Sequence, residues 1–175
     1  MHVDDGRSGK RGRPGNPERA VPSLLITTPP SVRAALGDNT GSRGLGLVLI
    51  ADDTFDTREL YEVYLTGQGF SVQTVTDGEA AVEVAIAIVP DVIVMDISMP
   101  RLDGVAATRQ LKEHPRTRHV PVVIWTAYPH KAIQRGALEA GADAFMVKPC
   151  LPEELEHHLR SLIPNGQRRG PAADA

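Results

Sequence analysis

The chain has 175 residues, a formal charge of −3 and a single cysteine, Cys150. One cysteine excludes an internal disulfide, and no apolar run approaches the roughly 20 residues of a membrane span, so the sequence predicts a cytoplasmic protein without a membrane partner. The charge is uneven: residues 1–43 carry +3 and residues 164–175 carry +1, which leaves −7 on residues 44–163. An acidic body of this kind argues against direct nucleic-acid binding, which depends on clustered Lys and Arg.

The two ends of the chain differ in composition from its middle. Residues 1–43 contain glycine and proline throughout and show neither helical nor strand periodicity, which predicts a disordered, basic N-terminal arm. Residues 164–175 predict a flexible C-terminal tail for the same reason. Residues 44–163 have the size of one ordinary domain, and no second globular domain or output domain is expected.

Within this middle region, strand and helix patterns alternate five times. The apolar run Leu45–Ala51 predicts a strand buried on both faces of a parallel sheet. A helix is expected from about Thr54 to Gly67, with an apolar stripe of Leu60, Tyr61, Tyr64 and Leu65. The later strands are predicted at 70–75, 92–95, 120–125 and 144–147. The later helices are predicted between the turn at 76–78 and Pro90, and at 105–113, 130–140 and 152–162.

This alternation predicts an α/β fold, a doubly wound five-stranded parallel sheet with helices on both faces. Open sheets of this kind place their chemistry at the carboxyl ends of the strands. Four of the predicted strands end there in polar side chains, which are Asp52 and Asp53, Asp96, Thr126 and Lys148.

Each of these side chains, taken alone, has an ordinary explanation. Asp52 and Asp53 suit a helix cap, Thr126 a strand-end hydroxyl bonded to backbone, and Lys148 a solvated surface charge. Taken together they need another explanation, because three clustered carboxylates repel one another unless a cation lies among them. Mg²⁺ prefers oxygen ligands and commonly binds one or two carboxylates plus phosphate oxygens, so the set predicts a site for Mg²⁺ and a phosphoryl group.

Six short motifs follow one another in order along the chain. They are Asp52-Asp53, Met95-Asp96-Ile97-Ser98-Met99-Pro100, Asp103-Gly104, Thr126-Ala127, Gly141-Ala142-Asp143 and Lys148-Pro149. With these motifs, residues 45–163 resemble the CheY-like receiver domain of two-component response regulators, in its single-domain form. The resemblance implies a flavodoxin-like sheet with strand order 2-1-3-4-5 and a cis peptide bond between Lys148 and Pro149.

The resemblance also implies how the polar side chains act. Asp96 would be the phosphoacceptor. Asp53, Asp96 and the backbone carbonyl of Ser98 would ligate Mg²⁺, and Asp52 would act through a metal-bound water. The Lys148 ammonium would pair with a phosphoryl oxygen, which reduces the charge that opposes attack by a carboxylate.

A second set of residues is implied in switching and in the lifetime of the phosphorylated form. The Thr126 hydroxyl would move to the new phosphoryl group, and the Phe145 ring would turn into the space left behind. A plain core role is the alternative for Phe145. Ser98 and Tyr128 occupy the positions that line the path of the hydrolytic water in this family, and the bulk of Tyr128 is expected to slow dephosphorylation.

The sequence thus predicts a response regulator, not an enzyme, that receives its phosphoryl group from a sensor histidine kinase or a phosphotransfer protein. The donor is expected to dock around Arg58, Glu59 and Glu62. A downstream protein would bind the surface made by the helix at 130–140, the strand at 144–147 and the last helix. A phosphorylation-dependent homodimer stays open.

Two alternatives come from other classes of protein. Residues 53–57 are similar to the motif of phosphohydrolases with a nucleophilic Asp, but Asp53 and Asp56 are one residue too far apart for it. The predicted loops are also too short to supply a substrate-specificity cap. The other alternative is a binding module that works without phosphorylation, which the complete set of polar strand-end residues argues against.

Overall fold

The structure is a computed structural model that describes residues 44–163. The predicted N-terminal arm and C-terminal tail lie outside the described residues. Within 44–163, no helix has the length and apolar character needed to cross a membrane.

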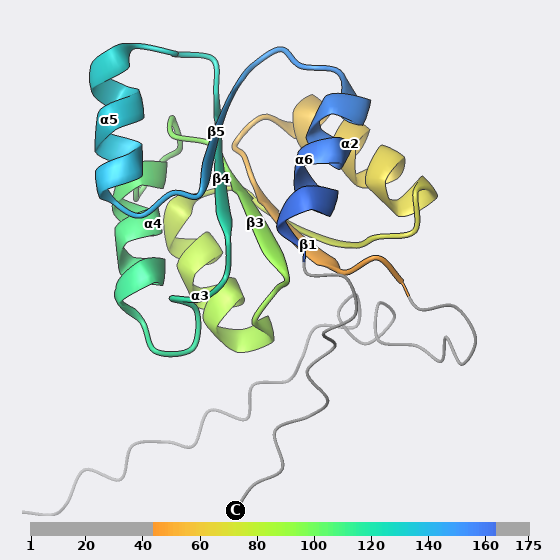
Figure 1. Cartoon of the computed structure of the whole chain (residues 1–175), viewed down its shortest axis with the longest axis horizontal. Helices are drawn as coiled ribbons and strands as arrows, with labels where there is room; N and C mark the ends of the chain where they lie inside the picture. Colours follow the sequence, from red (N-terminus) through yellow and green to blue (C-terminus); the bar gives the residue numbers. More distant parts are fainter. Residues whose placement is uncertain (1–43, 164–175) are drawn as a thin grey trace, which may run out of the picture.

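Five parallel strands form one sheet in the order β2-β1-β3-β4-β5, which confirms the predicted fold (Figure 1). The strands are β1 (Leu47–Ala51), β2 (Ser71–Val75), β3 (Val92–Met95), β4 (Val122–Thr126) and β5 (Ala144–Val147). The helices are α2 (Phe55–Gly67), α3 (Gly78–Ile88), α4 (Gly104–Glu113), α5 (Lys131–Glu139) and α6 (Pro152–Leu162). The strand order reverses at β1, which lies between β2 and β3, and open α/β sheets bind their ligands at such a switch point.

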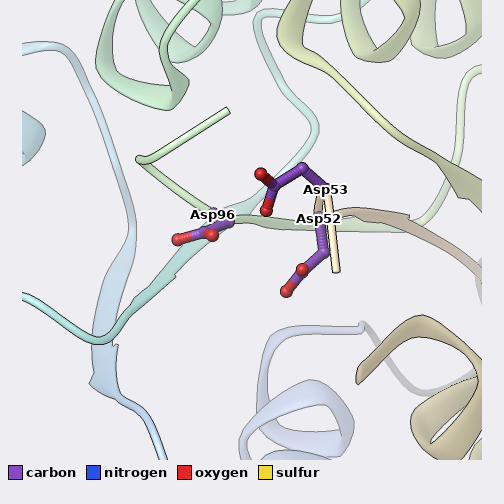
Figure 2. Close-up of side chains that lie close together, drawn as sticks. All are labelled: Asp52, Asp53 and Asp96. Atoms are coloured by element: carbon purple, nitrogen blue, oxygen red, sulfur yellow. The ribbon is translucent and has the colours of Figure 1, made fainter. Parts of the chain in front are cut away.

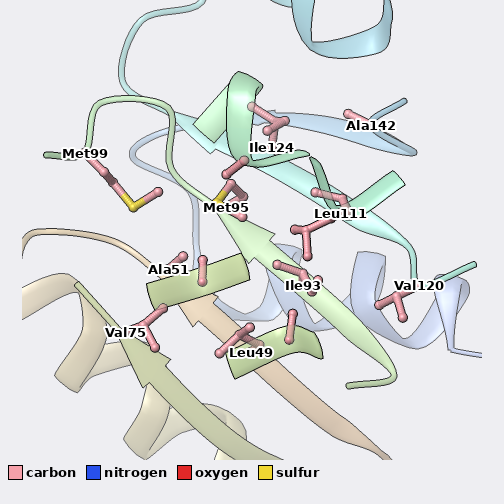
Figure 3. Close-up of a cluster of buried hydrophobic side chains, with 14 of the residues drawn as sticks. Leu49, Ala51, Val75, Ile93, Met95, Met99, Leu111, Val120, Ile124 and Ala142 are labelled. Carbon is pink, nitrogen blue, oxygen red and sulfur yellow. The ribbon is translucent and has the colours of Figure 1, made fainter. Parts of the chain in front are cut away.

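Alternating side chains along the strands build two hydrophobic clusters, one on each face of the sheet. In β1, Leu49 and Ala51 belong to the first cluster, whereas Val48 and Ile50 belong to the second. The first face is covered by α3, α4 and α5 through Ala81, Ala85, Ala107, Leu111 and Ala137. Figure 3 shows Leu111 of α4 among the side chains of this cluster. The second face is covered by α2 and α6 through Tyr61, Leu65, Leu155 and Leu159. Because helices cover both faces, the inner strand β1 is apolar on both sides, as predicted.

Several element boundaries differ from the prediction by one or two residues. β1 begins at Leu47 and not at Leu45, since the intervening Gly46 has a φ of 137° that interrupts the extended chain. β4 begins after Pro121, which has no N–H to give to a strand ladder. The predicted apolar stripe of α2 is wrong at Leu60, which is 55% exposed, because the buried row runs through Tyr61 and Leu65, one turn apart.

Candidate functional site

The carboxyl ends of the strands are level in the sheet and bring the predicted polar residues together. The last residues of β1 and β3 are register partners, so Asp52 and Asp96 leave the sheet at the same height. Thr126 is the last residue of β4, and its carbonyl accepts a hydrogen bond from the Lys148 N–H at 2.8 Å. Parallel register thus joins Asp52 to Lys148, which is 96 positions away in the chain.

Three carboxylates form the centre of the site. One oxygen from each of Asp52, Asp53 and Asp96 lies within 4.8 Å of the other two (Figure 2). Asp52 is fully buried and Asp96 is 6% exposed, whereas Asp53 is open to solvent. Carboxylates at this separation repel one another, so the arrangement favours a bound cation.

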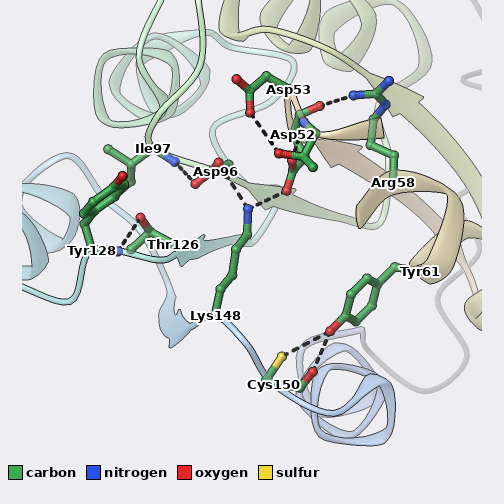
Figure 4. A network of polar contacts seen from close by, with 11 residues as sticks. Asp52, Asp53, Arg58, Tyr61, Asp96, Ile97, Thr126, Tyr128, Lys148 and Cys150 are labelled. Carbon is green, nitrogen blue, oxygen red and sulfur yellow. Dashed lines mark hydrogen bonds and ion pairs between the residues drawn. The ribbon is translucent and has the colours of Figure 1, made fainter. Parts of the chain in front are cut away.

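The Lys148 ammonium supplies part of the positive charge. Its Nζ lies 2.5 Å from Asp52 Oδ2 and 3.1 Å from Asp96 Oδ2 (Figure 4). The Lys148 side chain is 15% exposed, so both ion pairs lie largely out of solvent. A single ammonium does not neutralise three carboxylates, which leaves the centre negative.

Backbone N–H groups orient the two buried carboxylates. The Ile97 N–H donates to Asp96 Oδ1 at 2.7 Å, and the Thr54 N–H donates to Asp52 Oδ1 at 2.8 Å. Each buried carboxylate therefore has one oxygen on a backbone donor and the other on Lys148. Asp53 makes a longer contact, 3.4 Å, with the Thr54 hydroxyl, and its carboxylate is accessible to ligands from solvent.

The residues predicted for switching and lifetime surround this centre at different depths. Thr126 is fully buried, and its Oγ1 accepts a hydrogen bond from the Tyr128 N–H at 3.2 Å. The Tyr128 side chain is exposed, as is Ser98 on the loop after β3. Phe145 is half-buried and packs against the first hydrophobic cluster. The peptide bond that follows Lys148 is cis, which confirms that prediction.

Two neighbours of the site were missed by the sequence reasoning, an aromatic pair under Lys148 and an arginine contact to Asp52. The Trp125 and Tyr61 rings meet edge to face with centroids 4.4 Å apart, and Lys148 Nζ lies 4.7 Å from the centre of the Trp125 ring. A guanidinium nitrogen of Arg58 donates to the Asp52 carbonyl at 2.6 Å. Burial raises the pKa of the Tyr61 hydroxyl well above its usual range, so this group stays a neutral donor. These residues come from α2, β4 and the chain after β5, and no local pattern connects them.

The loop between β3 and α4 is held on both sides. Asp103 caps α4 by accepting hydrogen bonds from two backbone N–H groups of its first turn, each at 2.9 Å. Gly104 lies so close to Asp96 that a Cβ would stand 1.9 Å from the Asp96 carbonyl oxygen. Arg101, at a φ of 65°, forms an ion pair with the buried carboxylate of Asp77 at the start of α3. The Asp103-Gly104 motif therefore shapes the loop that carries Ser98.

Comparison with known proteins decides the family. The family described as response regulator receiver domain matches residues 48–160 of this chain. The chain belongs to this family. This receiver domain is 38% identical over 115 residues to the response regulator PleD of Caulobacter vibrioides, an alignment that covers 66% of this chain and 25% of PleD. The chain thus spans about a quarter of the length of that relative.

Two solved structures support the assignment as a receiver domain. One is the signal receiver domain of a signal transduction histidine kinase from Syntrophus aciditrophicus, at 32% identity and a TM-score of 0.67, covering 74% of this chain and 98% of that chain. The other is the receiver domain of a sensor histidine kinase from Pseudomonas aeruginosa PAO1, at 31% identity and a TM-score of 0.64. It covers 67% of this chain and 97% of that chain, and it has a magnesium ion coordinated in the active site cleft.

The donor set of this receiver domain fits Mg²⁺. Oxygens that share one octahedral Mg²⁺ at about 2.1 Å lie at most about 4.2 Å apart, close to the 4.8 Å that bounds the three carboxylates. The cluster offers carboxylate oxygens, the ligand type that suits this ion. The exposure of Asp53 leaves room for the waters that Mg²⁺ tends to keep.

Proposed function

We propose that this receiver domain accepts a phosphoryl group on Asp96 and signals by binding another protein. The observation that carries the proposal is the joint placement of three carboxylates and the Lys148 ammonium at one edge of the sheet. Membership of the receiver family supports it, because phosphorylation-activated signalling is the standard role of that family. The proposed setting is a cytoplasmic two-component pathway.

The surroundings of Asp96 suit a nucleophile that is held in place. The Ile97 N–H and the Lys148 ammonium orient its carboxylate. One carboxylate oxygen would attack phosphorus while the bond from phosphorus to the donor breaks, releasing a histidine nitrogen from a phosphohistidine or acetate from acetyl phosphate. The product is an acyl phosphate on Asp96, and the Lys148 ammonium pairs with one of its phosphoryl oxygens.

Three oxygen ligands are proposed to hold Mg²⁺, the carboxylates of Asp53 and Asp96 and the backbone carbonyl of Ser98. Bound Mg²⁺ supplies neutralisation and alignment of the phosphoryl oxygens. Asp52 suits a contact through water, because it is fully buried and holds Lys148 more closely than Asp96 does, at 2.5 Å against 3.1 Å.

The proposed switch runs from Thr126 through Phe145 to the surface formed by α5, β5 and α6. On phosphorylation, the Thr126 hydroxyl would leave the Tyr128 N–H and bond to a phosphoryl oxygen. The half-buried Phe145 ring, which lies on the neighbouring strand, would then turn inward. A downstream protein would bind this surface, and a histidine kinase or phosphotransfer protein would dock around Arg58 on α2.

Intact-protein mass after incubation with acetyl phosphate tests the proposal. Wild-type protein with Mg²⁺ is expected to gain one phosphoryl group, and the gain should disappear with a chelator or in Asp96→Asn. Asp56→Asn is the matched control, because it removes an exposed carboxylate in the first turn of α2, outside the cluster. This control should be phosphorylated like the wild type.

Other results would point to other functions. An adduct that persists in Asp96→Asn would move the phosphoacceptor to another residue. Steady release of phosphate without an adduct would favour the phosphohydrolase. Absence of an adduct with acetyl phosphate and with phosphotransfer proteins alike would favour a binding module that works without phosphorylation.

A further inference from the structure

Trp125 lies directly beneath the site and is the only tryptophan of the chain. It immediately precedes Thr126 on β4, is 2% exposed, and belongs to the second hydrophobic cluster together with Tyr61 and Leu155. The Lys148 ammonium lies 4.7 Å from the centre of the indole ring, which is within the range of a cation–π contact. The Lys148 head group therefore packs over the face of the indole ring.

The indole brings an energetic penalty that a simple apolar side chain at this position would not. Within residues 44–163, its Nε1 is the one buried side-chain nitrogen or oxygen without a hydrogen-bond partner. An unpaired buried donor destabilises a fold, so packing alone would favour Leu, Met or Phe here. What Trp adds is the largest electron-rich ring face, and it binds cations better than Phe or Tyr.

Tyr61 links the Trp125 ring to the segment that carries Lys148. Its ring contacts Trp125 edge to face. Its hydroxyl donates to the Cys150 carbonyl at 2.6 Å, two residues beyond Lys148 (Figure 4). The Lys148 backbone is held at its other side by the hydrogen bond to the Thr126 carbonyl. Both the backbone and the head group of Lys148 are thus anchored to β4 and α2.

We propose that Trp125 is a positioning residue, which holds the Lys148 ammonium at the site through a cation–π contact. The inference rests on the proposed function. The Lys148 ammonium contacts Asp52, Asp96 and the Trp125 ring. During phosphoryl transfer Asp96 is consumed as the nucleophile and its ion pair with Lys148 is lost, so the ammonium then relies on Asp52 and on the ring. A flexible four-carbon lysine stem needs such a contact to keep its charge beside the incoming phosphoryl group.

Fluorinated tryptophans give the sharpest test, because fluorine weakens the ring's attraction for a cation with little change in its shape. With a single tryptophan in the chain, biosynthetic replacement by mono-, di- and trifluorotryptophan alters Trp125 alone. The initial rate of phosphorylation by acetyl phosphate at saturating Mg²⁺, followed by intact mass, should fall stepwise with each fluorine. Trp125→Leu should be slower by about tenfold, the size of a desolvated cation–π contact, and Trp125→Phe should recover part of the loss.

A second measurement separates the cation–π contact from packing. Fluorination should lower the thermal unfolding midpoint of the wild type, and it should have a smaller effect in Lys148→Met, where the ring faces no charge. Equal effects in the two backgrounds would overturn the inference. So would unchanged phosphorylation rates across the fluorinated series, even if Trp125→Leu failed to fold. The proposed function would stand in both cases if Asp96→Asn still abolished the adduct, whereas a wild type that gained none would overturn both.

Discussion

Asp52 and Asp53 are adjacent in the chain but lie in opposite environments. Successive side chains leave a strand end in opposite directions, so one carboxylate turns inward and the other turns to solvent. Asp52 is fully buried with both oxygens engaged, while Asp53 is exposed and makes one long contact. A carboxylate that must exchange water for a metal ion benefits from exposure. This difference supports Asp53 as the direct ligand and Asp52 as the anchor of Lys148.

Tyr128 is predicted to set the lifetime of the phosphorylated form. Its backbone N–H is hydrogen-bonded to Thr126 at the site, and its side chain is 55% exposed, so shortening it removes bulk without opening the core. Tyr128→Ala or Tyr128→Glu should shorten the lifetime severalfold by admitting water to the phosphoryl group. The measurement is the decay of the phosphorylated mass after acetyl phosphate is removed.

Leu138→Ala provides the matched control for Tyr128. Leu138 is similarly exposed, at 51%, but lies on the outer surface of α5 away from the carboxylates. Its truncation should leave the lifetime unchanged. If both variants decay at the wild-type rate, Tyr128 does not control access of water.

At the scale of elements, the loop from β3 to α4 depends on its attachment to α3. Arg101 crosses to Asp77, and Gly78 lies so close to the loop that a Cβ would stand 2.1 Å from the Leu102 carbonyl oxygen. Asp77 also caps α3 by accepting a hydrogen bond from the Ala80 N–H at 2.9 Å. Because the same loop carries Ser98, the position of the proposed metal ligand depends on a contact between α3 and the loop.

Asp77 is predicted to give the fold a stability that disappears in acid. The Ala80 N–H, and then Arg101, hold the pKa of the Asp77 carboxyl below its usual value of 3.8, although burial acts in the opposite direction. A lowered folded-state pKa means that the stabilisation is complete above pH 3.8 and is lost as the pH falls toward the folded-state value. Asp77→Asn should therefore cost about 1–2 kcal/mol at neutral pH and less below that value.

Urea unfolding of both proteins across this pH range measures the difference. Asn also caps helices well, so Asp77→Asn removes the charge and leaves an acceptor for the cap, whereas Asp77→Ala removes both and should be less stable still. A difference between wild type and Asp77→Asn that stays constant through the acid range would show that the charge of Asp77 contributes nothing.

The helices and strands could be predicted from the sequence because local residue patterns determine them. The continuous apolar run before Asp52 predicts a doubly covered strand, and Pro152 marks the first residue of α6. Predicted starts failed where one residue interrupts a regular pattern, as Gly46 does before β1 and Pro121 before β4. The structure explains these interruptions, but the sequence alone does not determine at which residue the strand begins.

The candidate site was predictable only in its polar part. Asp96 and Lys148 could be predicted from their residue types and positions, because both follow apolar runs that end at one edge of a parallel sheet. Trp125 and Tyr61 looked like ordinary core residues, because their contact with Lys148 depends on how β4, α2 and the chain after β5 pack together. The pairing of Arg101 with Asp77 was hidden for the same reason, as it joins two loops through a tertiary contact.

At the scale of the whole molecule, the site and the two ends of the described chain lie at opposite edges of the sheet. Gly46, just before β1, is so close to α6 that a Cβ would stand 3.2 Å from the Ile163 side chain. The Leu47 N–H donates to Asp91, just before β3, at 2.7 Å, which places this junction at the amino ends of the strands. The carboxylates lie at the carboxyl ends. Chain that precedes residue 44 or follows residue 163 therefore joins the domain far from the chemistry.

A chain reduced to residues 42–163 is predicted to fold and to be phosphorylated like the full chain. Residues 44–163 supply five strands of one sheet and the helices that cover both of its faces, and both hydrophobic clusters described above are built from them. Thermal unfolding should show one cooperative transition at the full-length midpoint, and acetyl phosphate should modify both proteins at equal rates. A lower midpoint would mean that the removed segments contribute to the fold, and an equal midpoint with a slower reaction would mean that they act on the site.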